Sequence, residues 1–181
     1  MGTTTRLMTL EDFERLPDEA ASLELLKGEL IRSPPPKRQH MEIAERLYLL
    51  LHETLLDLRN RRPELRLGKP HVEMGYLLGG DPKSWLRPDV SIAHPGQSGG
   101  DYYEGAPWVA VEVVSESEAA ADVDSKAQEY LSHGSEEVWL IYPKTRRAWI
   151  YRAGASTIER HEQTLRSELL PGLEIRLDEI L

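Results

Sequence analysis

The chain has 181 residues, of which 40% are hydrophobic and 29% charged, and this size and composition predict one globular domain spanning residues 1–181. Its 31 acidic and 22 basic residues give a formal net charge of −9. That charge excludes a protein that coats nucleic acid nonspecifically, because such binding depends on positive charge that displaces counterions. The absence of cysteine excludes disulfides and thiolate chemistry.

The apolar stretches are short. The longest, Trp108–Val114 and Val138–Tyr142, fall far below the roughly 20 residues that cross a bilayer. The N-terminal segment becomes acidic at Glu11 and lacks the apolar core of a secretory signal. We therefore expect a cytoplasmic protein with no membrane partner.

In the N-terminal third, the sequence predicts a short helix, a hairpin and a long helix. Thr9 begins a capping-box pattern, and the short helix it starts should end before Pro17. Apolar residues on either side of Gly28 predict a hairpin with strands 23–26 and 29–32. Apolar residues repeat with a 3.6-residue period over 39–59, which indicates an amphipathic helix.

The middle of the chain predicts strands. The alternation of Val72, Met74 and Tyr76 is typical of a strand with one covered face. A second strand contains Val90 and Ile92, so Asp89 and Ser91 should point to its opposite face. The nearly continuous apolar segment from Trp108 to Val114 then predicts a central strand that is buried on both faces.

The C-terminal part adds a helix and several strands. A helical apolar pattern over 118–133 is followed by a strand over 138–142. Strand, helix and strand in this order predict a right-handed crossover between parallel strands. The segments 148–151, 157–161 and 173–177 resemble short antiparallel strands. The predicted fold class is α/β, or α+β, with a mixed sheet flanked by helices.

Two acids stand out against this framework. Glu112 lies inside the apolar central strand, where a carboxylate needs a cation, a hydrogen-bond network or a metal to offset its burial. An ion pair with Arg87 or Lys126 is the structural alternative. If the strands are neighbours, Asp89 faces Glu112, and both stay ionised only when positive charge lies between them.

A divalent cation would supply that charge. Oxygen-rich sites suit Mg²⁺ or Mn²⁺, and the carbonyl of Val113 could be the third ligand beside Asp89 and Glu112. Lys126, on the following helix, could reach back to orient or deprotonate a water molecule. Alternatively, Lys126 forms a solvated ion pair with Asp122, four residues before it. If Lys126 acts on a water molecule beside the metal, the site is that of a metal-assisted hydrolase.

Several segments together resemble a bacterial restriction-endonuclease family, expanded in cyanobacteria, of the PD-(D/E)XK nuclease superfamily. The similarity runs in order from about Met8 to Arg152, and its motifs are LELLKGEL at 23–30, RPDV at 87–90, VEVVS at 111–115 and DVDSK at 122–126. The resemblance implies a restriction endonuclease-like domain, a mixed sheet between helices, and metal-dependent hydrolysis of phosphodiester bonds.

The resemblance also assigns site residues. Asp89 matches the first acid of the family motif, Glu112 matches the second, and Glu29 matches a family glutamate near the site that holds water or metal. The lysine of the superfamily, expected at Val114, matches Lys126 on the next helix instead.

Two further positions bear on the resemblance. Glu116 replaces a proline that is usual in the family, and this adds negative charge beside the predicted site. His40 falls where the family has a histidine, but with no second ligand nearby in the sequence we expect it to be a packing or capping residue.

Two functions of different classes follow. The first is a Mg²⁺- or Mn²⁺-dependent endonuclease acting on DNA, with Asp89, Glu112, Lys126 and Glu29 in its site. The second is a catalytically inactive nuclease-like scaffold for binding or assembly, which the net charge, Glu116 and the displaced lysine favour. A homodimer is also expected, since nucleases that cut both strands often pair. Basic clusters at 37–38, 59–62 and 144–147 could contact phosphates if they line the acidic site.

Overall fold

The computed structural model of the protein describes residues 7–17, 23–32, 35 and 37–181. In this part of the chain the helices are α1 (Leu10–Glu14), α2 (Arg38–Arg61), α3 (Ala120–Ser132) and α4 (Leu177–Ile180). The strands are β1 (Leu23–Leu26), β2 (Glu29–Arg32), β3 (Pro70–Val72), β4 (Tyr76–Leu78), β5 (Ser84–Leu86), β6 (Val90–Ile92), β7 (Tyr103–Glu104), β8 (Val109–Val113), β9 (Glu137–Tyr142), β10 (Arg147–Arg152), β11 (Glu159–His161), β12 (Thr164–Leu165) and β13 (Ile175–Arg176).

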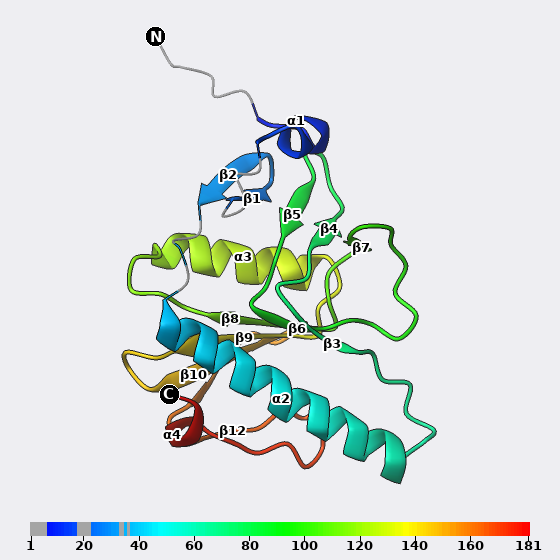
Figure 1. Ribbon diagram of the computed structural model, residues 1–181, viewed down its shortest axis with the longest axis vertical. Helices are drawn as coiled ribbons and strands as arrows, with labels where there is room; N and C mark the ends of the chain where they lie inside the picture. The colour runs from blue at the N-terminus through cyan, green and yellow to red at the C-terminus, as the bar shows by residue number, and fades with distance from the viewer. Residues whose placement is uncertain (1–6, 18–22, 33–34, 36) are drawn as a thin grey trace.

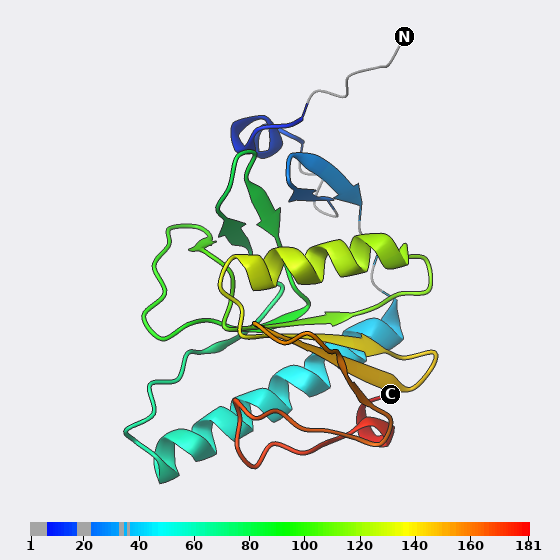
Figure 2. The same ribbon diagram turned by 180° about the vertical axis from the view of Figure 1, so that it is seen from behind.

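A six-stranded sheet forms the centre of the molecule, in the order β11-β10-β9-β8-β6-β3. Strands β8 and β9 are parallel and α3 connects them, whereas the other neighbours in this sheet are antiparallel. Helix α2 covers one face of the sheet and α3 covers the other (Figures 1 and 2). The mixed sheet between helices and the parallel pairing of β8 and β9 are thus confirmed.

The two faces of the sheet have separate cores because side chains alternate along each strand. Val109, Val111 and Val113 pack in the core cluster that contains the apolar face of α2. The buried residues of that helix are Ile43, Ala44, Leu47, Leu51, Leu55 and Leu58. On the opposite face, Ala110 packs with Tyr130 of α3. Every residue of β8 is buried, as the sequence predicts for the central strand.

A second, smaller sheet lies beyond α3, in the order β2-β1-β5-β4-β7 (Figure 1). Its hairpin β1–β2 has the predicted bounds. Short helix α1 also forms, and the Thr9 hydroxyl accepts a hydrogen bond from the Asp12 N–H at 3.2 Å. Strand β1 lies between β2 and β5, so its side chains are more buried than those of β2, which is at the edge of the sheet.

The prediction of one strand through Val72, Met74 and Tyr76 is wrong. The chain turns at Glu73, whose φ of 47° is outside the range of extended strands. Val72 therefore ends β3 in the large sheet, and Tyr76 begins β4 in the small sheet. The predicted strand over 173–177 is also shorter, because Leu177 begins helix α4.

Within the described ranges, no helix has both the length and the apolar character needed to pass through a bilayer.

The packing of α2 gives a test of the main core. Leu51 is fully buried on this helix, whereas Leu49 is 50% exposed. We expect Leu51→Ala to lower the free energy of unfolding by about 2–5 kcal/mol, because it leaves a cavity between helix and sheet. The matched variant Leu49→Ala should change it by less than about 0.5 kcal/mol. Urea denaturation followed by circular dichroism measures both, and equal losses would contradict this assignment of the buried face.

Candidate active site

The site begins where β6 and β8 run side by side. In their antiparallel register Val90 is opposite Val111 and Ser91 is opposite Ala110. One step further along the same ladder, Asp89 comes opposite Glu112. Because directly opposed residues share a face, both carboxylates belong to the face that α3 covers. The sequence expectation that these strands are neighbours is confirmed.

Helix α3 brings a cation and a hydroxyl to Glu112. The Lys126 ammonium lies 3.4 Å from Glu112 Oε1, and the Tyr130 hydroxyl donates a hydrogen bond to the same oxygen at 3.0 Å. Lys126 and Tyr130 are four residues apart, so they occupy the same face of the helix. All three residues are buried, and the ion pair between Lys126 and Glu112 that was considered as a structural alternative does form.

A third carboxylate joins the site from the small sheet. Glu24, in β1, is 2% exposed, and its Oε2 lies 2.6 Å from the Lys126 ammonium. Its other oxygen accepts a hydrogen bond from the Arg87 N–H at 2.8 Å. Lys126 therefore lies between Glu24 and Glu112, and it does not form an ion pair with Asp122 among the described residues.

Asp89 is held from two sides. Its Oδ2 accepts a hydrogen bond from the Val113 N–H at 2.6 Å, and its Oδ1 lies 2.8 Å from Nε2 of His40, in the first turn of α2. This contact is the main reason why the pKa of His40 is raised. Since the N–H and C=O of one strand residue point to the same side, the carbonyl of Val113 also faces Asp89. His40 thus orients the carboxylate of Asp89, a role beyond the packing or capping that the sequence predicts for it.

The site contains three carboxyl groups, those of Glu24, Asp89 and Glu112, and one ammonium, that of Lys126. Burial raises the pKa of Glu112 to about 8; Lys126 opposes this rise, and Asp89, Glu24 and Glu118 add to it. Although burial opposes its charge, Lys126 has a raised pKa because Glu112 and Glu24 stabilise the ammonium. One lysine therefore faces several carboxylates, and further positive charge would let Glu112 ionise at neutral pH.

The residues present fit a hard divalent cation. Carboxylate oxygens and a backbone carbonyl are the donors that Mg²⁺ and Mn²⁺ prefer, and each carboxylate oxygen keeps a lone pair beside its hydrogen bond. Within the part of the chain that the structure describes, no three histidine, aspartate or glutamate side chains form a ready-made metal cluster. The fit therefore involves two carboxylates and waters, the arrangement typical of Mg²⁺.

Glu29 is not brought into this cluster. It is exposed in the edge strand β2, opposite Leu26, whereas Glu24 on the neighbouring inner strand makes the buried contact to Lys126. The sequence contained a signal for Glu24, because it interrupts an apolar run, as Glu112 does. Tyr130 could have been found from its position one helical turn after Lys126.

Glu116 lies at the surface beyond β8. Its side chain is 66% exposed and lies 3.2 Å from the ammonium of Lys144. The Lys144 ammonium offsets the negative charge of Glu116. Such an exposed pair contributes little to stability.

The raised pKa of Glu112 predicts how stability depends on pH without added metal. Between about pH 4.5 and 8 the folded protein keeps a proton that the unfolded chain has lost. Stability should therefore fall as pH rises through this window, by up to about 1.4 kcal/mol per pH unit. Glu112→Gln should remove this contribution, whereas Glu53→Gln, at an exposed position of α2, should keep it. Urea denaturation in EDTA across the window measures the slopes, and identical slopes for all three proteins would contradict the prediction.

Comparisons with known proteins agree with this architecture. A crystal structure described as a putative nuclease belonging to DUF820, from Anabaena variabilis, has the same fold, with a TM-score of 0.80, 19% identity, and coverage of 96% of this chain and 97% of that chain. No curated protein matches the sequence. The family model described as "Uma2: Putative restriction endonuclease" matches residues 10–178. Because this match spans nearly the whole chain, the protein belongs to the Uma2 family, the restriction endonuclease-like family that its motifs resemble.

Proposed function

We propose that this protein is a divalent-metal-dependent endonuclease that hydrolyses phosphodiester bonds in DNA. The observation that carries the proposal is the meeting of Asp89 and Glu112 on adjacent strands, with the buried Lys126 ammonium 3.4 Å from Glu112. Membership in a restriction endonuclease-like family supports it. Carboxylates that share a site with a fixed ammonium are suited to chemistry on a phosphate, where negative charge develops in the transition state.

In this proposal Asp89, Glu112 and the carbonyl of Val113 hold Mg²⁺ or Mn²⁺. When bound, the ion would polarise the phosphate and lower the pKa of a water molecule. Asp89 is kept in place by the Val113 N–H and by His40, and Glu112 by Tyr130. These hydrogen bonds fix the directions of the carboxylates, as partners of metal ligands commonly do.

Lys126 acts as a cation in this site. Its raised pKa keeps it protonated at neutral pH, so it orients a water molecule or stabilises charge on the phosphate, and it does not accept a proton. Of the two roles that the sequence suggests for Lys126, orienting or deprotonating a water molecule, the proposal keeps only the first. Glu24, at 2.6 Å, is a positioning residue that holds the ammonium in place.

A catalytically inactive scaffold is the second candidate. One observation favours it: the side chain of Lys126 is only 6% exposed, and the ion pairs that it forms with described residues are with Glu24 and Glu112. A lysine that serves only to neutralise buried acids would look the same. The homodimer expected from the sequence stays a prediction, which sedimentation of the purified protein tests.

Cleavage assays separate the two candidates. We expect cutting of duplex DNA that needs Mg²⁺ or Mn²⁺, stops with EDTA, and falls about 100-fold or more in Asp89→Asn. Glu24→Gln should lose about tenfold to 100-fold, because it frees the ammonium. Glu29→Gln is the matched control, since it removes the same charge from the same hairpin and should cut like the parent. If the folded parent cuts no nucleic acid with either ion, the scaffold is correct.

Metal binding gives an independent test. Calorimetry should detect Mn²⁺ binding to the parent at neutral pH, with proton release, because ionisation of Glu112 accompanies binding. Glu112→Gln should weaken binding by at least about tenfold and abolish that release. Equal affinity in the parent and in Glu112→Gln would mean that the metal site lies elsewhere.

A further inference from the structure

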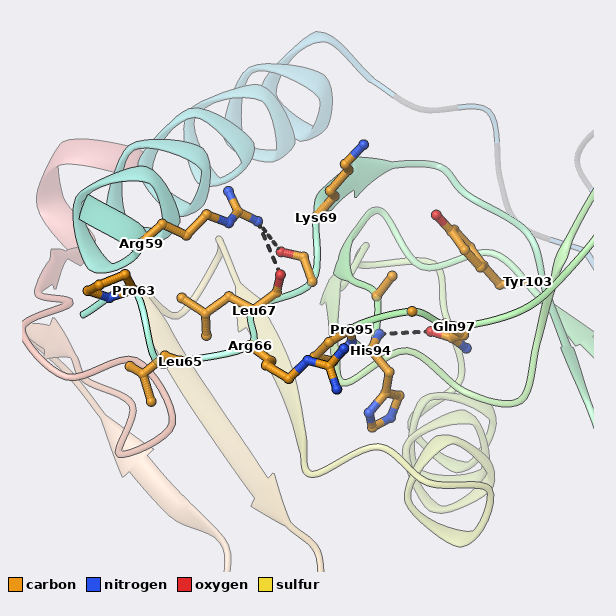
Figure 3. A pocket seen from close by; sticks show the side chains of 13 residues that line it. Arg59, Pro63, Leu65, Arg66, Leu67, Lys69, His94, Pro95, Gln97 and Tyr103 are labelled. Carbon is orange, nitrogen blue, oxygen red and sulfur yellow. Dashed lines mark hydrogen bonds between the residues drawn. The ribbon is translucent and has the colours of Figure 1, made fainter. Parts of the chain in front are cut away.

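A basic hollow of about 550 Å³ lies at the other end of the β3–β6 pair. The loop before β3 and the loop after β6 form its walls, and Figure 3 shows the residues that line it. Arg59, Arg66 and Lys69 are among them, together with His94, and none of the lining residues is acidic. The chain has a net charge of −9, but the hollow has several cations and no acid, so its local charge is positive.

Two of these cations are available to a ligand. Arg59 is turned back to the chain, because its guanidinium donates hydrogen bonds to the carbonyls of Leu67 and Gly68 (Figure 3). Arg66 and Lys69 are exposed, and neither forms an ion pair with a residue that the structure describes. No acidic side chain in the described ranges therefore neutralises these two charges.

The walls of the hollow are fixed by short-range contacts. The Ala93 N–H donates to the carbonyl of Lys69 at 3.0 Å. Gly68 has no room for a side chain, since a Cβ there would collide with the carbonyl oxygen of Ala93. On the opposite wall, the Gln97 side chain accepts the His94 N–H at 2.9 Å and donates to the carbonyl of Ala106 at 2.9 Å. The loops are thus held in place before any ligand binds, which lowers the cost of binding.

The hollow and the acidic site share one ladder. At one end of the β3–β6 ladder the Ala93 N–H donates a hydrogen bond to the carbonyl of Lys69. At the other end the Glu73 N–H donates one to the carbonyl of Asp89. Lys69 is opposite Ala93 on this ladder, and Ala93 is four positions after Asp89. Residues an even number of positions apart lie on one face of a strand, so Lys69 and Asp89 belong to the same face of the sheet. Four residues separate the two ends, or about 13 Å at the rise of a strand.

We propose that Arg66 and Lys69 bind two backbone phosphates of the nucleic-acid substrate, a few nucleotides from the phosphate held at Asp89 and Glu112. The ladder length of about 13 Å is several times the roughly 3.4 Å by which one nucleotide advances along the axis of a duplex, so these phosphates are different from the one at the acids. This inference rests on the proposed function for the identity of its ligand. It adds the register in which the substrate crosses the sheet edge, with the acids at one end of β3 and the basic hollow at the other.

The test compares two paired variants with the same change in charge. Arg66→Gln/Lys69→Gln removes the free cations of the hollow, and Arg166→Gln/Arg176→Gln removes two exposed arginines near the C-terminal strands. Affinity for a labelled DNA duplex is measured by fluorescence anisotropy in Ca²⁺ at several salt concentrations, and cleavage kinetics are measured in Mg²⁺. Circular dichroism verifies that each variant is folded.

We expect the first pair to bind about tenfold more weakly, to raise KM while kcat stays unchanged, and to reduce the salt slope of log affinity by about 1.8. The second pair should match the parent. If Arg66→Gln/Lys69→Gln binds like the parent, or if both pairs weaken binding equally, the subsite is overturned while a cutting parent keeps the proposed function. A parent that binds DNA through the hollow without cutting overturns the nuclease and leaves the subsite. A parent that binds no duplex overturns both.

Discussion

The buried ammonium of Lys126 links three elements that are distant in the sequence. It lies 2.6 Å from Glu24 in the small sheet and 3.4 Å from Glu112 in the large sheet, and it comes from the helix between them. Removing one partner of a buried ion pair leaves an uncompensated charge, which costs several kcal/mol. The packing of α3 between the sheets and the charge balance of the site therefore depend on each other.

This contact gives a physical account of the displaced lysine. Val114 follows β8 two residues after Glu112, where the superfamily resemblance places a lysine. In this chain the ammonium reaches the same carboxylate from α3, and Tyr130, one turn later, donates to the same oxygen. A cation supplied from the helix is equivalent for the carboxylate, because the electrostatic interaction depends on distance and burial and not on the strand of origin.

The sequence predicts part of this site for local reasons. Glu112 could be found because an acid in an apolar strand needs a partner, and Asp89 because alternation places it on the opposite side from Val90. Glu24 has the same local signal, but its burial depends on β5, a three-residue strand whose Trp85 pairs with Leu25 of β1, 60 positions earlier in the chain. Pairing of such short, distant strands is not encoded in any local pattern, and Glu29 is a candidate only through the family resemblance.

The break between β3 and β4 at Glu73 has no local sequence signal either. The alternation of Val72, Met74 and Tyr76 is regular. Only the positive φ of Glu73 shows that the chain passes there from the large sheet to the small sheet. Tertiary packing overrides the local preference here, as it commonly does for strands. The helix α2 could be predicted nearly in full, because a 3.6-residue apolar period over many turns has few other solutions.

The proposed nuclease function brings a polyanionic substrate to an acidic site, and this requires a specific charge arrangement. The carboxylates of Glu24 and Asp89, and that of Glu112 once it ionises, would repel a phosphate, and the ammonium of Lys126 does not balance all three. Interactions between exposed charges are screened over about 10 Å at moderate salt, so surface acids elsewhere matter little at the basic hollow. The hollow, about 13 Å away along the β3–β6 ladder, could therefore hold the backbone independently of the acids. A divalent cation is then needed only where the reaction occurs, and the proposed metal would both permit the close approach of the phosphate and activate it.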